Sequence, residues 1–282
     1  MPDELIASCG TGTGSTGGSQ GMDLIGSSGF VGSTLRRQAD FGSLFRSTTI
    51  GGVAGQHFDG VVCAAAPAQK WIANRDPAAD RKHIDGLIAH LRTLTCKRFV
   101  LISTVDVFGA PVGVTEDTPV DEAGLHAYGL HRRMLEVFVK EHFPDHLVVR
   151  LPGLVGPGLR KNVIFDFLND NNLHAIDSRG VFQFYPMVNL WYDIQCALGH
   201  GLKLVHLTAE PVSVAEVAEL GFNRPFSQAV VDVPATYDMR TQYAGLFGGT
   251  GDYQYSRRES IQAIRAYAQS EQPKAAEGGA VK

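Results

Sequence analysis

Short apolar runs alternate with longer amphipathic segments along the first half of the chain. A run of four to eight apolar residues predicts a strand, whereas apolar positions spaced by three and four predict a helix. The runs that predict strands are 22–25, 44–50, 60–65, 98–104 and 147–151. The segments that predict helices are 30–40, 77–94 and 127–142.

Strands separated by helix-length segments imply right-handed crossovers between parallel strands. The run 98–104 is almost continuously apolar, as expected of a strand buried on both faces. The pattern therefore predicts an α/β fold, a Rossmann-type doubly wound parallel sheet. After about residue 157 the alternation becomes irregular, with helical patterns near 190–199 and 256–268, which indicates a smaller C-terminal substrate lobe.

The predicted organisation has two ordered parts and two disordered ends. We expect residues 22–165 to form the sheet domain and 166–270 the smaller lobe. The leader 1–21 and the tail 271–282 are rich in small and polar residues that bury too little apolar area to offset ordering entropy. The leader contains a literal G-x-G-x-x-G at Gly12, Gly14 and Gly17, but neither a strand nor a helix flanks it, so we expect no phosphate site there.

Composition excludes several classes of protein. Apolar residues make up 44% and charged residues 19%, values of an ordinary globular chain. Twenty-five basic and 29 acidic side chains, without a basic cluster, argue against a nucleic-acid partner. No run approaches the roughly 18 apolar residues of a membrane span. Four dispersed cysteines, without metal-ligand spacing, predict a cytoplasmic protein with no metal site.

The strongest local signal is the turn DLIGSSGFVGSTL between a predicted strand and a predicted helix. Gly26 permits a tight turn, Gly29 lets the backbone approach a pyrophosphate, and Gly32 lets the helix pack close to the strand. The alternative is a glycine-rich turn without a ligand. The predicted cofactor contacts in this segment are Gly26, Ser28, Gly29, Phe30, Val31 and Gly32.

The end of the second strand bears on the choice of cofactor. Dinucleotide folds place an acidic residue there, about 20 residues past the glycines, to bind the ribose hydroxyls. This chain instead has Arg46 followed by Ser47, Thr48 and Thr49. A cation with hydroxyl groups accommodates a 2′-phosphate, so both NAD and NADP are candidate cofactors. Alternatively, Arg46 is a solvated surface residue.

Together with the glycine turn, four segments resemble, in order and spacing, the extended short-chain dehydrogenase/reductase family, the sugar-nucleotide epimerases and dehydratases. They are VVCAAAP at 61–67, LISTVDVFG at 101–109, AYGLHRRMLE at 127–136 and VRLPGLVGPG at 149–158. The resemblance implies a small-molecule substrate, a nucleotide sugar, and a homodimer. It also implies cofactor contacts at Ala64, Ala65, Ala66 and Pro152.

In that family a Ser or Thr and the Tyr of a Y-x-x-x-K motif act together on the substrate C–O–H group. Thr104 and Tyr128 match those positions. A phenol with a pKa of about 10 needs a neighbouring cation to act as a base near neutral pH. The resemblance therefore assigns proton exchange to Tyr128 and a hydrogen bond on the same oxygen to Thr104, while the nicotinamide takes or returns hydride.

The chain departs from the family where Arg132 replaces the lysine. Arginine keeps the charge, so it can lower the tyrosine pKa and bond a ribose, but it cannot release a proton. Either Arg132 serves as a fixed charge or the hydride chemistry is weakened or lost. His131 is an alternative cation, although it points roughly 100° away around the helix.

Asp106 matches one acid/base carboxylate of the sugar-nucleotide dehydratases, while Val105 stands where they carry the other. The incomplete pair favours hydride transfer or epimerisation over elimination of water. Alternatively, Asp106 only caps a loop.

Four polar residues are candidate substrate contacts beside Thr104: Lys70, Lys161, Asn162 and Arg240. Arginine suits a diphosphate because its guanidinium donates two parallel hydrogen bonds. The alternative for the basic residues is surface salt bridging. Trp71 lines the substrate edge or belongs to the core between the two parts.

The sequence thus predicts an NAD(P)-dependent oxidoreductase or epimerase acting on a nucleotide sugar or a similar hydroxyl compound. The second hypothesis is a catalytically degenerate dinucleotide-binding protein with a regulatory or scaffold role. A hydrolase ranks below both because no G-x-S-x-G elbow occurs.

Overall fold

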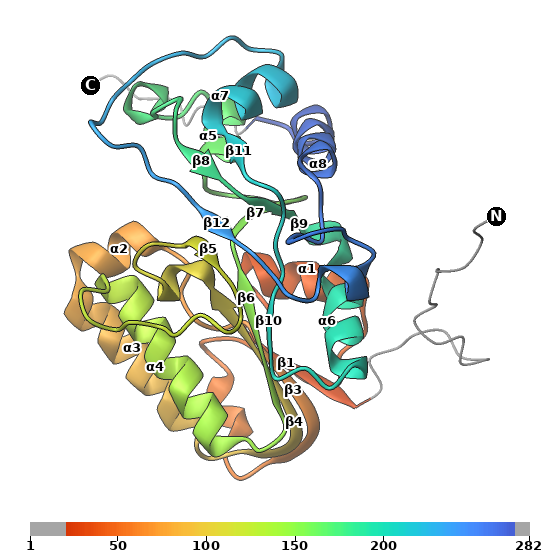
Figure 1. The fold of residues 1–282 in the computed structure, drawn as a ribbon. Helices are drawn as coiled ribbons and strands as arrows, with labels where there is room; N and C mark the ends of the chain where they lie inside the picture. Colours follow the sequence, from red (N-terminus) through yellow and green to blue (C-terminus); the bar gives the residue numbers. More distant parts are fainter. Residues whose placement is uncertain (1–20, 274–282) are drawn as a thin grey trace, which may run out of the picture.

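The computed structural model describes residues 21–273 and is built on a six-stranded parallel sheet (Figure 1). The strand order is β10-β6-β4-β3-β1-β2, with every neighbouring pair parallel. The strands are β1 Met22–Ile25, β2 Leu44–Phe45, β3 His57–Cys63, β4 Thr95–Thr104, β6 His146–Leu151 and β10 Leu204–His206. The chain moves outward from β1 in both directions, so the predicted doubly wound Rossmann-type fold is confirmed.

Helices cover both faces of the sheet. α1 (Phe30–Gln38) and α6 (Leu190–Gly199) pack on one face, and α3 (Pro77–Leu91) and α4 (Ala127–His142) pack on the other. Successive strand residues point to opposite faces. Val62 accordingly joins the cluster under α1 and α6, while its neighbour Val61 joins the cluster under α3 and α4. This two-sided burial explains the near-continuous apolar strands.

A smaller lobe with its own core lies beyond the carboxyl ends of the strands (Figure 1). Its apolar cluster includes Ile164 of α5, Phe184 of β9 and Ile264 of α8. Its helices are α5 Val163–Asn169, α7 Val214–Glu216, η5 Val217–Gly221 and α8 Arg257–Ser270. Its short strands are β7 Gly153–Val155, β8 Val181–Phe182, β9 Phe184–Pro186 and β11 Val212–Ser213. A parallel pair, β5 Val112–Val114 and β12 Asp238–Met239, joins the lobe to the sheet part.

The remaining elements are short connections. They are η1 Ile50–Val53, α2 Lys70–Arg75, η2 Val105–Val107, η3 Leu173–Ala175, η4 Met187–Asn189 and η6 Ala244–Phe247. The second strand, expected over 44–50, ends at Phe45, and the chain then turns into η1. The connection from β2 to β3 therefore contains no α-helix, which leaves room for α3 to pack against η1.

The boundary expected at residue 165 does not separate the two parts. α6 and β10 lie within 166–270, yet both belong to the sheet and its helical cover. β10 is three residues long, and its pairing with β6 rather than any local pattern makes it a strand. The predicted leader and tail, with Gly12, Gly14 and Gly17, lie outside the described residues except for Gly21 and the three residues 271–273.

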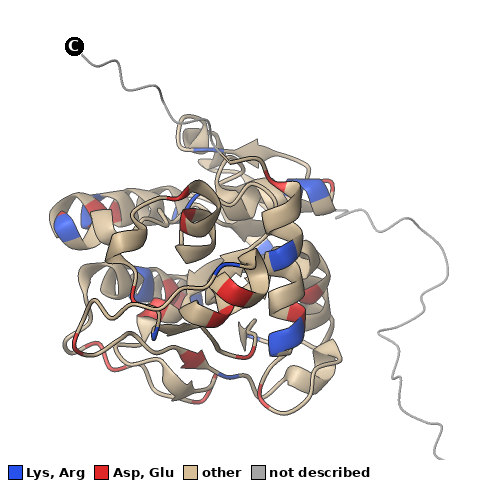
Figure 2. Ribbon diagram, turned by 90° about the horizontal axis from the view of Figure 1, so that it is seen from above, with Lys and Arg blue, Asp and Glu red and all other residues tan. Residues whose placement is uncertain are grey.

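The described residues also bear on membrane, metal and charge. Between residues 21 and 273 no helix is both long enough and apolar enough to cross a membrane. Over the same range no group of three or more His, Cys, Asp or Glu side chains is arranged to hold a metal ion. Basic and acidic residues are interspersed over the elements (Figure 2).

A buried carboxyl group joins α6 to the lobe. Asp193 is 2% exposed and accepts hydrogen bonds from the hydroxyls of Tyr185 and Tyr255, the latter at 2.9 Å. Burial raises the pKa of Asp193 to about 6, because the two hydroxyl bonds offset only part of the desolvation.

Asp193→Asn should change the pH dependence of stability. The native state holds this proton more tightly than the unfolded chain, so wild-type stability is lost as pH rises from about 4 through 6. Asparagine does not ionise, and we expect the stability of the variant relative to wild type to increase by about 3 kcal/mol across this window. Urea unfolding at pH 4, 5, 6 and 7.5 measures the difference. Parallel pH curves for the two proteins would contradict the assignment.

Candidate active site

A cavity of about 1270 Å³ lies at the carboxyl ends of β1, β3, β4 and β6, beneath the lobe. The strand order reverses between β1 and β3, and open α/β sheets bind their ligands at such a crevice. Nearly all of the site residues predicted from the sequence line this cavity. Those that do are Gly26, Ser28, Gly29, Phe30, Val31, Arg46, Ala64, Ala65, Ala66, Lys70, Thr104, Asp106, Tyr128, Arg132, Pro152, Lys161 and Asn162.

The turn after β1 can accept a dinucleotide phosphate. Gly26 has a φ of +90°, and a Cβ there would lie 2.5 Å from the Ala64 carbonyl carbon. A Cβ on Gly32 would lie 2.1 Å from the Gly26 oxygen, so Gly32 packs α1 against the turn without lining the cavity. Gly29 caps α1, and among residues 21–273 no side-chain cap bonds the first amides of the helix. These N–H groups fit the pyrophosphate of NAD or NADP.

The other end of the cavity is cationic. Arg46 and Ser47 border it together with a face of α3 that carries Lys82, His83 and His90. Arg46 and Lys82 are both exposed. Among the described residues that line the cavity, Asp106 is the only carboxylate, and it lies at the opposite end with Thr104. The described residues at this end of the cavity therefore include no carboxylate that could bind the free 2′-hydroxyl of the NAD ribose.

Tyr128 lies at the start of α4, facing the end of β4. His126 caps the helix by accepting a hydrogen bond from the Gly129 amide at 3.0 Å. Tyr128 is 8% exposed, and the nearby Thr104 hydroxyl acts to lower the pKa of its phenol. Burial raises the pKa of Tyr128, although the charge of Arg132 opposes that rise. The tyrosine is therefore protonated at neutral pH, whereas the sequence led us to expect a lowered pKa.

Arg132 lies over the face of the Tyr128 ring, 4.0 Å from its centroid, and is 2% exposed. Its terminal nitrogens donate to Asp80 at 2.5 Å, to the Pro67 carbonyl at 2.5 Å and to the Tyr128 carbonyl at 3.3 Å. Both terminal nitrogens are thus bound by the protein, whereas the buried Nε has no hydrogen-bond partner among the described residues. This geometry fits the expectation that Arg132 serves as a fixed charge. It does not support the expected bond from Arg132 to the cofactor ribose.

Asp80 of α3 was not predicted from the sequence. It accepts from Arg132 and contacts His131 Nδ1 at 2.7 Å. Burial alone raises the pKa of Asp80, but the bonds from Arg132 and His131 outweigh it and hold the pKa below its ordinary value. The signal available in the sequence was a carboxylate on the buried stripe of α3, which Ile84 and Leu91 continue. Such a position requires a cationic partner.

Asp106 forms the centre of a second polar cluster, at the reacting end of the cavity. Its Oδ1 accepts from Lys70 Nζ at 2.6 Å and from the Tyr237 hydroxyl at 3.0 Å. Lys70 Nζ also donates to the Tyr237 hydroxyl at 3.0 Å. The Thr104 hydroxyl lies 3.5 Å from Asp106 Oδ2. The Asp106 carboxylate thus faces the cavity and is bound by side chains rather than by a loop amide. Tyr237 was not predicted as a site residue, because it lies far from Asp106 in the sequence.

The remaining predicted substrate contacts differ in outcome. Lys161 and Asn162 line the cavity, but the Asn162 side chain caps α5, accepting from the Ile164 amide at 3.0 Å. Arg240 does not line the cavity. It pairs instead with Asp238 at 2.8 Å and Asp252 at 3.2 Å, so the structure separates it from the site. Trp71, also outside the cavity lining, is 62% exposed and does not belong to the core.

A buried ion pair holds α4 in place. Glu136 accepts from Arg150 Nε at 2.9 Å and from Arg150 Nη2 at 2.7 Å, and the Ser103 hydroxyl donates to it at 2.7 Å. Glu136 and Arg150 are 0% and 1% exposed. Because β4, β6 and α4 all meet at this pair, it fixes the position of Tyr128 relative to Thr104.

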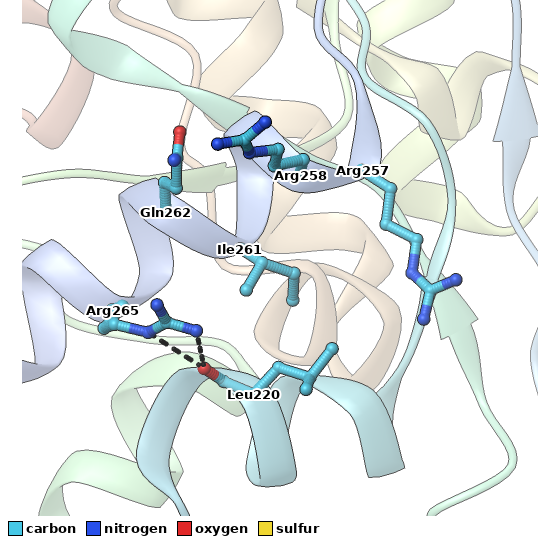
Figure 3. A pocket seen from close by; sticks show the side chains of 6 residues that line it. All are labelled: Leu220, Arg257, Arg258, Ile261, Gln262 and Arg265. Atoms are coloured by element: carbon cyan, nitrogen blue, oxygen red, sulfur yellow. Dashed lines mark hydrogen bonds between the residues drawn. The ribbon is translucent and has the colours of Figure 1, made fainter.

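A second pocket of about 560 Å³ lies between α8 and η5 (Figure 3). Leu220 and Ile261 form its apolar part, and three arginines surround them. Arg265 donates to the Leu220 carbonyl and Arg257 to Glu216. None of the predicted site residues lines this pocket, so the chemistry belongs to the first cavity.

Comparison with known proteins agrees with this geometry. Residues 41–175 match the NAD dependent epimerase/dehydratase family. No curated protein matches the sequence.

Solved structures share the fold at low identity. A dTDP-4-dehydrorhamnose reductase from Clostridium acetobutylicum has 18% identity and a TM-score of 0.66, covering 88% of this chain and 98% of its own. RMD from Pseudomonas aeruginosa, complexed with NADPH, has 19% identity and a TM-score of 0.64, covering 89% and 100%. The Bordetella bronchiseptica enzyme WbmG, in complex with NAD, has 16% identity and a TM-score of 0.65, covering 88% and 93%.

The family match spans Thr104 at the end of β4 and Tyr128 at the start of α4, and the glycine turn just before the matched segment has the geometry that a dinucleotide requires. Residues 41–175 therefore resemble the NAD dependent epimerase/dehydratase family, and the chain shares its fold with solved enzymes that bind NADPH or NAD.

Proposed function

We propose that this chain reduces a carbonyl group of a nucleotide sugar or a similar compound, with Tyr128 as the proton donor. The observation that carries the proposal is the meeting of Tyr128, Thr104 and the Gly26 turn in one cavity. A protonated tyrosine suits donation to a carbonyl oxygen, whereas the reverse oxidation requires a phenolate. The raised pKa of Tyr128 keeps the phenol in this proton-donating form at neutral pH.

The residues divide between two tasks. Gly26, Gly29 and the first amides of α1 would hold the pyrophosphate, and the bound nicotinamide would supply hydride. Tyr128 would give its hydroxyl proton to the substrate oxygen, which Thr104 orients by a second hydrogen bond. Lys161 and Lys70 line the same cavity and would offer positive charge to the substrate.

Nucleotide sugars are supported as the substrate class by the solved relatives. These include a UDP-galactose 4-epimerase and WbmG in complex with NAD and UDP. The cavity of about 1270 Å³ exceeds the range of about 300 to 1000 Å³ typical of small-ligand pockets and suits a dinucleotide beside a second nucleotide.

The cysteine spacing supports a cytoplasmic location, and the family resemblance supports a homodimer.

One observation favours the second candidate, a degenerate dinucleotide-binding protein. Arg132 is bound to Asp80 and the Pro67 carbonyl, so it contributes less charge to Tyr128 than a free cation would. The two candidates predict different activities, because only the enzyme would turn over a substrate. A chain that binds NADPH but transfers no hydride to UDP- or dTDP-linked keto sugars would support the regulatory role.

Tyr128→Phe should abolish turnover without weakening cofactor binding. The ring and its contact with Arg132 remain, and only the proton is lost. We expect hydride transfer to fall by a factor of about 100 or more. The loss of reduced-nicotinamide absorbance with UDP- and dTDP-linked 4-keto sugars measures turnover, and calorimetry measures cofactor affinity. Tyr192→Phe, on the exposed face of α6, is the matched control. Equal turnover in the two variants would remove Tyr128 from the mechanism.

The cationic end of the cavity leads us to propose NADP as the preferred cofactor. Arg46→Ala should weaken NADPH binding about tenfold or more, since a charge-assisted bond to the 2′-phosphate is lost. NADH affinity should stay within about twofold, because NADH lacks that phosphate. Calorimetry with both cofactors tests this, and Arg160→Ala, a cation elsewhere in the same cavity, is the control. An equal loss for NADPH and NADH would contradict the assignment.

A further inference from the structure

Among the described residues, Asp80 of α3 is the only carboxylate that pairs with Arg132. It is buried, and its Oδ2 accepts from Arg132 Nη1 at 2.5 Å. The same oxygen lies 2.7 Å from His131 Nδ1. Burial raises the pKa of Asp80, yet the bonds from Arg132 and His131 outweigh it, so the carboxyl group is ionised at neutral pH. α3 thus presents a negative charge to α4.

The guanidinium of Arg132 is held through its terminal nitrogens. Besides the bond to Asp80, Nη1 donates to the Tyr128 carbonyl at 3.3 Å and Nη2 donates to the Pro67 carbonyl at 2.5 Å. The buried Nε has no hydrogen-bond partner within residues 21–273. A hydrogen bond to a charged acceptor is stronger than one to a neutral carbonyl. Asp80 therefore contributes the strongest of the bonds that fix the guanidinium.

The bound guanidinium lies over the ring of Tyr128. Its central carbon is 4.0 Å from the ring centroid, within the range of a cation–π contact. Burial raises the pKa of Tyr128, and among the nearby charges that of Arg132 opposes the rise most strongly. A cation beside a phenol stabilises the phenolate that remains after the proton leaves. The position of the guanidinium therefore affects how readily Tyr128 donates its proton.

Four other polar side chains lie near Tyr128: Thr104, Asp106, Lys70 and His126. Asp106 adds to the rise in the pKa of Tyr128, whereas Thr104 and Lys70 oppose it less than Arg132 does. In the described part of the chain none of these four side chains bonds Asp80 or Arg132. A change at Asp80 therefore reaches Tyr128 through Arg132.

We propose that Asp80 is a positioning residue, which acts through Arg132 on proton donation by Tyr128. This inference rests on the proposed function, in which Tyr128 donates to a carbonyl oxygen. Asp80 has two effects of opposite sign. Its hydrogen bond holds the cation against the ring, and its charge limits how far that cation favours loss of the proton. The phenol thus stays protonated before substrate binds, yet a cation lies beside the phenolate that donation leaves.

Two substitutions separate holding from charge. Both polar contacts of the Asp80 side chain with α4 are made by one oxygen, Oδ2. Asp80→Asn can therefore keep them with its amide oxygen while it removes the charge. Asp80→Ala removes the charge and the bonds together, so the guanidinium loses its strongest bond.

A titration of position 128 measures both effects without any cofactor or substrate. Tyr128 alone is replaced by 3,5-difluorotyrosine, whose electron-poor phenol titrates at a lower pH than tyrosine, and the fluorine resonance is followed. We expect Asp80→Asn to lower the apparent pKa of this phenol by about 0.5 pH unit or more, because Arg132 stays in place uncompensated. Asp80→Ala should raise it by about the same amount, because the guanidinium leaves the ring.

A double-mutant cycle shows whether the effect passes through Arg132. Arg132→Met should raise the apparent pKa of the phenol, and adding Asp80→Ala to it should change the value far less than Asp80→Ala does in the presence of Arg132. The double variant leaves no unpaired buried charge, so it avoids the instability expected of Asp80→Ala alone. The matched control is Asp85→Ala, which removes an exposed carboxylate paired with Arg81 on the same helix and should leave the titration unchanged.

Turnover of UDP- and dTDP-linked 4-keto sugars with NADPH relates the titration to catalysis. Asp80→Ala should lower kcat about threefold or more and leave KM within about twofold, because proton donation weakens while the ligand contacts remain. Asp80→Asn should keep kcat within about twofold of the wild type. A purely structural role would change the folded fraction but would not shift the phenol titration of the folded protein.

Phenol shifts of the same sign in Asp80→Asn and Asp80→Ala would overturn the inference, and so would a shift in Asp85→Ala as large as that in Asp80→Ala. If Asp80→Ala does not fold, a raised or unchanged pKa in Asp80→Asn overturns it equally. Each of these results leaves the proposed function standing if Tyr128→Phe is inactive and NADPH binds. A wild type that does not bind NADPH would instead defeat the proposed function itself.

Discussion

The close contact between the β1 turn, the end of β3 and the start of α1 is the constraint on which the site depends. A side chain at Gly26 or Gly32 would collide with the backbone at 2.5 Å and 2.1 Å. Without side chains at these two positions, α1 points its first amides into the crevice where the strand order reverses. A ligand phosphate then meets N–H groups that no side chain of the described residues caps.

The reacting end is assembled from elements far apart in the chain. Thr104 comes from β4, Tyr128 from α4, Lys70 from α2 and Tyr237 from the lobe. Two buried ion pairs hold them in position: Glu136 with Arg150 fastens α4 to the sheet, and Arg132 with Asp80 fastens it to α3. Removing one partner of such a pair would leave an uncompensated buried charge. Both pairs therefore resist being separated.

The arginine in the place of the family lysine keeps a positive charge but has no proton to release. Arg132 is buried, paired and permanently charged, so it works as a structural cation. Lys70, a titratable cation at the same end of the cavity, bonds the Asp106 carboxylate at 2.6 Å. The solved relatives, at 14 to 19% identity, share the fold, and the chemistry of this chain must be argued from its own residues.

The sequence by itself determined the sheet class, the glycine turn and the start of α4, because each depends on local periodicity or on glycine spacing. Thr104 and Tyr128 were found because each lies at the end of a recognisable element. Only the tertiary structure decided that β10 completes the sheet, that Asp80 neutralises Arg132, that Arg240 lies away from the site and that Tyr237 reaches Asp106. Each of these facts depends on contacts between residues far apart in the sequence. Burial in the folded protein also keeps Tyr128 protonated, and no local sequence pattern indicates this.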